Sequence, residues 1–221
     1  SPLAEQGKVS AMKRAVVALM TAATLAGCGG RREPETVAGA RAPVADWRRV
    51  ATLSDRDRLR TWRTVWLDAL GRARASGATR EIDAQGALFN PDHGLPDPIP
   101  PAGDYRCRVF KLGAKAKGGR DYVAYPAYTC RVSGEGPVRM FEKTAGSQRP
   151  AGRIFLLRAA RAVFLGTLAI GDEARWLPYG RDSARDMAGF VDRISDDRWR
   201  IALPQPAFDS TLDIIELVPA R

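Results

Sequence analysis

The chain has 221 residues, with 35 lysines and arginines against 25 aspartates and glutamates, which gives a net charge of +10. This length is enough for one domain with a sizeable core. One histidine and three cysteines provide too few ligands for a zinc centre, and no calcium, phosphate or dinucleotide motif has the required spacing. We therefore expect no metal and no cofactor.

The positive charge is mostly arginine and is spread along the chain among carboxylates. A basic surface favours anionic partners of the cell envelope, although a solvated surface explains the same composition. No DNA- or RNA-binding motif is visible, so we expect no nucleic-acid partner.

Residues 12–28 have the organisation of an export signal. Met12 is followed by two basic residues, and the uncharged apolar segment 15–26 is too short to span a bilayer as a mature helix. The segment ends in Leu-Ala-Gly-Cys28, which resembles the lipobox of bacterial lipoproteins. The resemblance implies that Cys28 carries the lipid and becomes the first mature residue. Residues 1–27, upstream residues and signal peptide together, are then removed.

The segment 28–45 is rich in glycine, proline, alanine and charge, which predicts a flexible tether between the lipid and the folded domain. Gly29 stands where aspartate marks lipoproteins for the inner membrane, so the resemblance favours the outer membrane. We expect a protein held on the periplasmic face of the envelope, with the membrane as a partner through the lipid anchor.

A single folded domain is expected over 46–221, beginning with a helical region over 46–89. Asp46 is suited to cap a first turn, and Ser54 with Asp57 forms a weak capping signal for a longer helix that ends at Gly77. A second short helix is predicted over 79–89. Apolar residues recur every three or four positions on one face of the first helix, which indicates a core-facing stripe: Leu59, Trp62, Trp66, Leu70 and Ala73.

The segment 90–103 contains five prolines and is predicted to be an extended connector strapped across the domain. It holds the only histidine, His93. A serine–histidine–aspartate triad would have to use this loop residue, and no nucleophile-elbow motif is present, so a surface role for His93 is the better interpretation.

From Asp104 onward the hydrophobic period is two, which predicts antiparallel β-structure over 104–221. The fold class is therefore α+β: N-terminal helices followed by an antiparallel barrel-like or sandwich domain of about eight to nine short strands. We favour an up-and-down barrel with the helices packed against it, and a short helix around 183–188. The strands are expected at 104–112, 121–132, 137–144, 152–157, 162–170, 175–179, 188–194, 198–203 and 212–218.

Cys107 and Cys130 remain as a pair in an oxidising compartment, where a disulfide is the default. If Gly118 and Gly119 form a two-residue hairpin turn, opposed residues have numbers that sum to 237, and the two cysteines face each other. The same register places Val109 opposite Tyr128 and Tyr105 opposite Val132.

Candidate ligand contacts are Ser147, Gln148 and Arg149 in the segment that joins two strands. A hydroxyl, an amide and a guanidinium are adjacent there, and arginine binds carboxylate or phosphate with two hydrogen bonds. The alternative is a turn whose polar groups bond their own backbone. A basic cluster in the first hairpin, Lys115, Lys117 and Arg120, is suited to anionic lipid or glycan, or is simply a solvated turn.

Several stretches resemble a family of proteobacterial lipoproteins known as domain of unknown function 4893. The resemblance implies export and paired cysteines, and it supplies no activity and no catalytic residue. It is carried by DWRRVATLSDRDRLRTWR (46–63), GDYRCRVFKLGAK (103–115), YVAYPAYTCRV (122–132), GSQRPAGRIF (146–155), FLGTLAIGDE (164–173), YGRDSARDMAGFVDRI (179–194) and FDSTLDIIELVP (208–219).

The leading functional prediction is a lipid-anchored envelope protein that binds a ligand or partner and is more plausibly not an enzyme. The ligand is a small apolar molecule inside the barrel, or a protein or glycan on its surface. An arginine-rich structural or assembly contact is a further option. The enzymatic alternative is a hydrolase of an envelope glycan that uses two carboxylates, with candidates Glu142, Glu173, Asp213 and Glu216.

Overall fold

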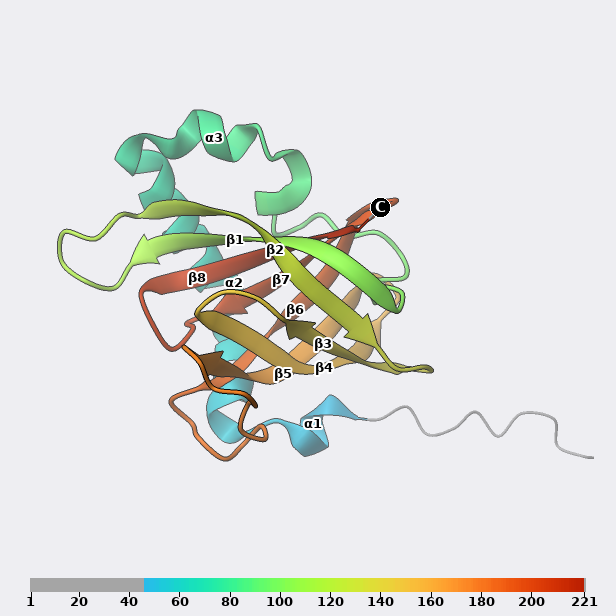
Figure 1. The fold of residues 1–221 in the computed structure, drawn as a ribbon. Coiled ribbons are helices and arrows are strands. Elements are labelled where there is room, and N and C mark those ends of the chain that lie inside the picture. The colour runs from blue at the N-terminus through green and yellow to red at the C-terminus, as the bar shows by residue number, and fades with distance from the viewer. Residues whose placement is uncertain (1–45, 221) are drawn as a thin grey trace, which may run out of the picture. The chain divides into compact units, whose positions relative to one another are not determined.

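The computed structural model describes residues 46–220, which form a closed eight-stranded antiparallel barrel with one long helix on its outer wall (Figure 1). The predicted lipid-bearing Cys28, the signal peptide (1–27) and the tether (28–45) lie outside the described residues. The described segment has one apolar core inside the barrel and two further clusters that the helical region shares with the barrel, and is expected to fold by itself. Within it, no helix is both long and apolar enough to cross a membrane.

The predicted barrel is confirmed, with strands that each pair with the next in the chain and β8 returning to β1. This order is that of an up-and-down barrel. Strands β2 and β3 pair only over Cys130–Ser133 of β2, so the earlier part of β2 has no partner on that side. The strands are β1 (Gly103–Ala114), β2 (Tyr122–Ser133), β3 (Val138–Lys143), β4 (Gln148–Arg158), β5 (Arg161–Ile170), β6 (Asp186–Ser195), β7 (Arg198–Pro204) and β8 (Ser210–Pro219).

The helical region begins with α1 (Trp47–Val50), which Asp46 caps by accepting a hydrogen bond from the Arg48 amide at 3.0 Å. The long helix α2 (Leu53–Ala73) begins two residues earlier than Ser54 and Asp57 predict. Thr52 is its cap and accepts from the Asp55 amide at 3.2 Å. The region continues through a π-helical turn (Arg74–Ala78), α3 (Thr79–Asp83) and a 3-10 helix (Gly86–Phe89). Gly77, at φ 100°, breaks the α-helical path as expected.

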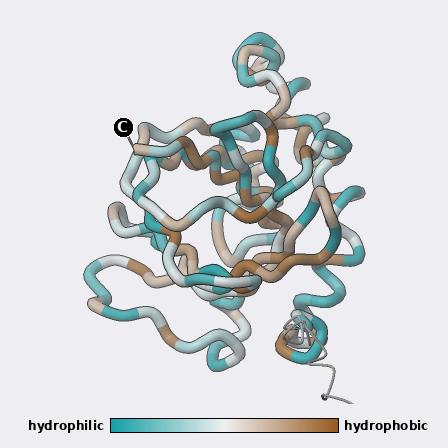
Figure 2. Tube along the Cα trace, turned by 90° about the vertical axis from the view of Figure 1, so that its right-hand side faces the viewer, coloured by the Kyte–Doolittle hydropathy of each residue, from teal (hydrophilic) through white to brown (hydrophobic). Residues whose placement is uncertain are grey.

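The predicted apolar stripe of α2 faces the outer wall of the barrel, behind β1, β8, β7 and β6 in Figure 1. Trp66 and Ala73 are buried against outward-facing residues of the barrel, and Leu70 is partly buried there. Leu59 joins a second cluster with β5 and β6, and Trp62 contacts both clusters. Figure 2 shows the hydrophobic segments concentrated on the strands.

Two predicted elements between β5 and β6 are wrong. Residues 175–179 form no strand, because β5 and β6 pair directly with each other and leave no place for another strand. Tyr179 instead donates a 2.5 Å hydrogen bond to Asp55, which ties the loop to α2. Residues 183–185 are a turn, and β6 begins at Asp186, so the short helix predicted around 183–188 is absent.

The predicted disulfide joins Cys107 to Cys130, with their Cα atoms 5.9 Å apart, inside the barrel. The predicted register is wrong by two residues: Cys107 lies opposite Tyr128, and Tyr105 lies opposite Cys130. The reason is the connecting loop, which spans 115–121 rather than two glycines. The bridge therefore runs diagonally between strands, a separation that side chains still reach.

The barrel interior is filled by side chains over most of its length. Phe141 and Phe164 meet edge to face with ring centroids 5.9 Å apart, and Tyr105 and Trp199 do so at 6.1 Å. All four belong to the core that surrounds the disulfide. An eight-stranded barrel is just wide enough for such filling.

The proline-rich connector covers one end of the barrel, as the strap interpretation predicts. Leu95 forms a β-bridge with Arg193, and Ile99 packs against the interior core. Tyr105 donates its hydroxyl hydrogen to the carbonyl of Pro101 at 2.7 Å. His93 lies in this strap and contacts the carbonyl of Ile194 at 3.1 Å through Nε2.

A buried ion cluster fastens the strap to the barrel. Asp192 of β6, fully buried, accepts from Arg200 of β7 at 2.9 Å and from Arg161 of β5 at 2.6 Å. Arg200 also donates to four carbonyls at the start of the strap and just before it, those of Ala87, Leu88, Asn90 and His93. Arg161 donates to the carbonyl of Pro91. Removing the carboxylate leaves two arginines without their shared counter-ion.

We predict that Asp192→Ala lowers the free energy of unfolding by about 3–5 kcal/mol, because a buried charge then lacks its partner. Chemical denaturation measures this change. The matched control is Asp57→Ala, which removes an exposed pairing with Arg60 and is expected to cost less than about 1 kcal/mol. Equal effects of the two substitutions would contradict the role given to the cluster.

Candidate functional site

The two ends of the barrel differ in their loops. At one end the connections are the short turns 134–137, 159–160 and 196–197, together with the strap. At the other end, here called the mouth, lie the longer connections 115–121, 144–147, 171–185 and 205–209. Binding residues are often placed on long loops that a rigid scaffold holds in position. The mouth is therefore the place to search for a site.

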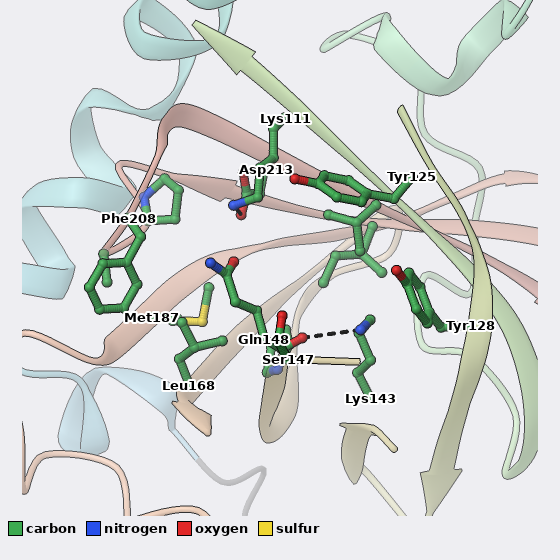
Figure 3. A pocket seen from close by; sticks show the side chains of 15 residues that line it. Lys111, Tyr125, Tyr128, Lys143, Ser147, Gln148, Leu168, Met187, Phe208 and Asp213 are labelled. Atoms are coloured by element: carbon green, nitrogen blue, oxygen red, sulfur yellow. Dashed lines mark hydrogen bonds and ion pairs between the residues drawn. The ribbon is translucent and has the colours of Figure 1, made fainter. Parts of the chain in front are cut away.

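A pocket of about 90 Å³ opens at the mouth (Figure 3). A cavity needs at least roughly 15 Å³ of such space to hold one water, so this pocket has room for a few waters or a small organic ligand. The lining residues are Val109, Lys111, Tyr125, Tyr128, Lys143, Ser147, Gln148, Pro150, Leu168, Met187, Pro206, Ala207, Phe208, Asp213 and Ile215.

One wall of the pocket holds a neutralised ion pair. Lys111 of β1 and Asp213 of β8 are register partners, and their charged atoms lie 3.3 Å apart. Asp209 lies 3.5 Å from the same amino group, and Ser210 donates a short hydrogen bond to Asp213. Burial raises the pKa of Asp213, while the charge of Lys111 opposes that shift. On this wall the two carboxylates balance the ammonium groups of Lys111 and Lys115, since Lys115 also interacts electrostatically with both carboxylates.

A second lysine lies across the pocket without such a partner (Figure 3). Lys143, at the end of β3, is 5% exposed, and no carboxylate of residues 46–220 forms an ion pair with it. Its amino group donates to the carbonyls of Ala145 and, at 3.1 Å, Gln148. It also lies 3.9 Å from the ring centroid of Tyr128, a cation–π distance.

Burial lowers the pKa of Lys143 to about 8, and the charge of Arg149 lowers it further in the same direction. The 144–147 loop passes close to this amino group. Gly146 adopts a left-handed φ of 90°, and a Cβ there would lie 2.6 Å from the Lys143 Nζ. A larger residue at position 146 would strain the backbone and displace the amino group.

The rest of the pocket wall is apolar. Leu168 and Met187 rise from β5 and β6, and Phe208 reaches in from the 205–209 loop (Figure 3). Phe208 is 40% exposed, so part of its ring forms the rim. An apolar wall that faces a few convergent polar groups is the usual composition of a small-molecule site.

The three predicted ligand contacts separate in the structure. Ser147 and Gln148 line the pocket, and Gln148 donates to Asp209 at 3.0 Å. Arg149 does not line it. Its guanidinium donates to the carbonyls of Gly146, Gly171 and Glu173 and so braces two loops. Arg149 therefore follows the alternative prediction, in which the polar groups of this segment bond to the backbone rather than to a ligand.

The two lysines of the pocket, Lys111 and Lys143, were not singled out in the sequence. Within the strand predicted over 137–144, Phe141 and Lys143 share one face by period two. A lysine on the same face as a core phenylalanine was the available signal. That pattern indicates a binding residue only once it is known that this strand end reaches the mouth, and the barrel topology is what shows this.

Of the four candidate carboxylates, only Asp213 lines the pocket. Glu216 lies on the outer wall with Arg198 at 2.5 Å, and Glu173 pairs with Arg185 at 2.6 Å in the 171–185 loop. Glu142 alternates with the inward-facing Phe141 and Lys143 and so faces outward. In the part of the chain that the structure describes, no three acidic, histidine or cysteine residues converge as metal ligands.

A family model, described as domain of unknown function (DUF4893), matches residues 47–217. The chain belongs to the DUF4893 family. The matched span begins in α1 and ends within β8, so this DUF4893 domain is the barrel with its helix, its disulfide and its mouth pocket. Comparison with the curated proteins and with the solved structures finds no match.

We predict that Lys143 changes the pH dependence of stability in this DUF4893 domain. Its pKa is about 8 when folded and about 10.5, the ordinary lysine value, when unfolded. Between pH 8 and pH 10.5 the Lys143 amine is neutral in the folded protein and protonated in the unfolded chain. The free energy of unfolding therefore rises with pH across this range. The wild type should therefore gain roughly 2 kcal/mol relative to Lys143→Met between pH 7.5 and pH 10.

Denaturation curves at the two pH values measure this difference. Lys117→Met is the matched control, because Lys117 is an exposed lysine of the 115–121 loop and its removal should leave the pH dependence unchanged. A difference between wild type and Lys143→Met that stays constant from pH 7.5 to pH 10 would show that the amine is not perturbed by burial.

Proposed function

We propose that this chain is a lipid-anchored protein of the bacterial cell envelope whose barrel binds a small ligand at its mouth without chemically changing it. The observation that carries the proposal is the pocket. It is open at one end of a barrel that is otherwise filled, and it combines an apolar wall with convergent amine, hydroxyl and amide groups.

The anchor rests on the sequence. The basic residues after Met12, the apolar segment 15–26 and the cysteine at position 28 occur in the order of a lipoprotein signal. The proteobacterial family resemblance and Gly29 support attachment to the outer membrane on its periplasmic side. The disulfide agrees with an oxidising compartment.

The rim of the mouth supports a membrane surface as a partner. Exposed apolar side chains on two mouth loops lie on the same rim as cations with no ion-pair partner in residues 46–220. Such a mixture suits the interface of a bilayer that contains anionic lipid. The apolar members are Trp176, Leu177 and Phe208, and the cations are Lys117, Arg120, Arg175 and Arg181.

The size of the pocket limits the ligand. Because side chains fill the barrel around the disulfide, a long apolar molecule has no continuous space along the axis. A small ligand fits at the mouth instead, in a pocket of about 90 Å³. The hydrolase alternative has less support, since the pocket holds one of its four candidate carboxylates and that residue is paired with Lys111.

We predict that the domain isolated from the periplasm carries a small ligand that native mass spectrometry detects. Ser147→Trp should abolish this additional mass, because the large ring would fill the pocket from its exposed edge. Thr61→Trp, on the exposed side of α2, is the matched control and should keep the ligand. A domain that never carries or takes up a small molecule would contradict the proposed binding function.

We also predict that the mature chain begins with an acylated Cys28. Mass spectrometry of the N-terminal peptide from the membrane fraction measures this directly. Cys28→Ser should abolish the acyl mass and cleavage at this position. An unmodified Cys28 in membrane-extracted protein would contradict the anchor and leave the ligand proposal standing.

A further inference from the structure

Extending the proposed binding function, on which this step rests, we infer that the mouth pocket selects a small organic monoanion, such as a short-chain carboxylate. The negative group binds the amino group of Lys143, and the apolar body lies against Leu168, Met187 and Phe208.

The charges that line the pocket identify the binding group. They are Lys111, Lys143 and Asp213. Lys111 and Asp213 form an ion pair, so the positive charge of Lys143 is the one left without a counter-ion. A buried charge is costly unless it is paired, and a ligand that brings a negative charge supplies the missing partner.

The hydrogen-bond count agrees with the charge count. A protonated lysine has three N–H donors. Those of Lys143 reach the carbonyls of Ala145 and Gln148, and no third oxygen acceptor for it exists in residues 46–220. The remaining donor meets only the face of the Tyr128 ring and no protein oxygen, so a ligand oxygen would be its one charged acceptor, in a pocket that Tyr125 and Ser147 also line.

The opposite wall explains why the ligand carries a single negative charge. Asp209 and Asp213 both lie within 3.5 Å of the Lys111 amino group, and Lys115 interacts electrostatically with both carboxylates, so that wall has no ammonium charge left for a second anionic group. A second negative group on the ligand would face these carboxylates across a small pocket. Repulsion between like charges therefore disfavours dianions.

The groups that face Lys143 predict how binding depends on pH. Arg149 and the Tyr128 ring lie closest, and Lys111 and Asp213 line the same pocket from β1 and β8, with Asp209 and Lys115 interacting with that pair from outside the lining. A bound anion stabilises the protonated amine, so above pH 8 binding requires proton uptake. Affinity should be constant below that pH and should fall up to tenfold for each pH unit above it.

The test measures binding of pentanoate and of its neutral analogue pentanamide to the domain spanning 46–221 by isothermal titration calorimetry. Pentanoate should bind to the wild type at least tenfold more tightly than pentanamide. Lys143→Met should remove that preference, leaving the two affinities equal, while Arg158→Met, which removes an exposed cation at the end of the barrel opposite the mouth, keeps it. A preserved circular dichroism spectrum shows that each variant is folded.

Three outcomes would overturn the inference: no binding of pentanoate to the wild type, equal affinity for the two probes, or tighter binding of the dianion glutarate. If pentanamide binds as well as pentanoate and Ser147→Trp blocks both, the pocket remains a ligand site and only the anion selectivity fails. A preference for pentanoate that persists unchanged from pH 7 to pH 10 would also contradict binding of the anion by the protonated amino group of Lys143.

Discussion

The bond between Arg200 and Asp192 is the constraint on which the rest of this structure depends. A fully buried guanidinium holds together strands β6 and β7 and the carbonyls of the strap, with Arg161 completing the cluster from β5. Such a cluster is stable only when every charge and donor is satisfied. It fixes a proline-rich segment that could form neither helix nor sheet, and so one end of the barrel is covered. The mouth follows as the accessible end.

At the mouth, one buried charged group lacks a counter-ion. Lys111 meets its carboxylate partners, whereas Lys143 is buried with two carbonyls, an aromatic face and no counter-ion. Proteins rarely keep such a charge unless something else pairs with it. The loop around Lys143 is built for it, since Gly146 approaches the amine and Arg149 braces the loop from outside the pocket. The contrast between the two lysines connects the fold to the proposed ligand.

The sequence predicted the architecture because its signals are local. Period-two alternation and turn residues indicate short antiparallel strands, and the stripe around Trp66 indicates the helix that covers them. The errors arose where distant contacts decide. The cysteine pair was predicted from a hairpin register that the 115–121 loop changes, and Tyr179 belongs to a loop because Asp55 of α2 accepts its hydrogen. Lys143 was missed because its neighbours in the chain do not show that this strand end opens into a pocket, whose other walls come from β1, β5, β6 and β8.

The most direct test of this account is a crystal structure of the domain spanning 46–221 after a brief soak in bromide, recorded at the bromine absorption edge. Bromide is a monoanion small enough for a pocket of about 90 Å³. The account predicts an anomalous peak beside the Lys143 amino group, inside a barrel whose other end is covered by the strap. A pocket filled by side chains, or bromide sites confined to the exposed arginines, would contradict it.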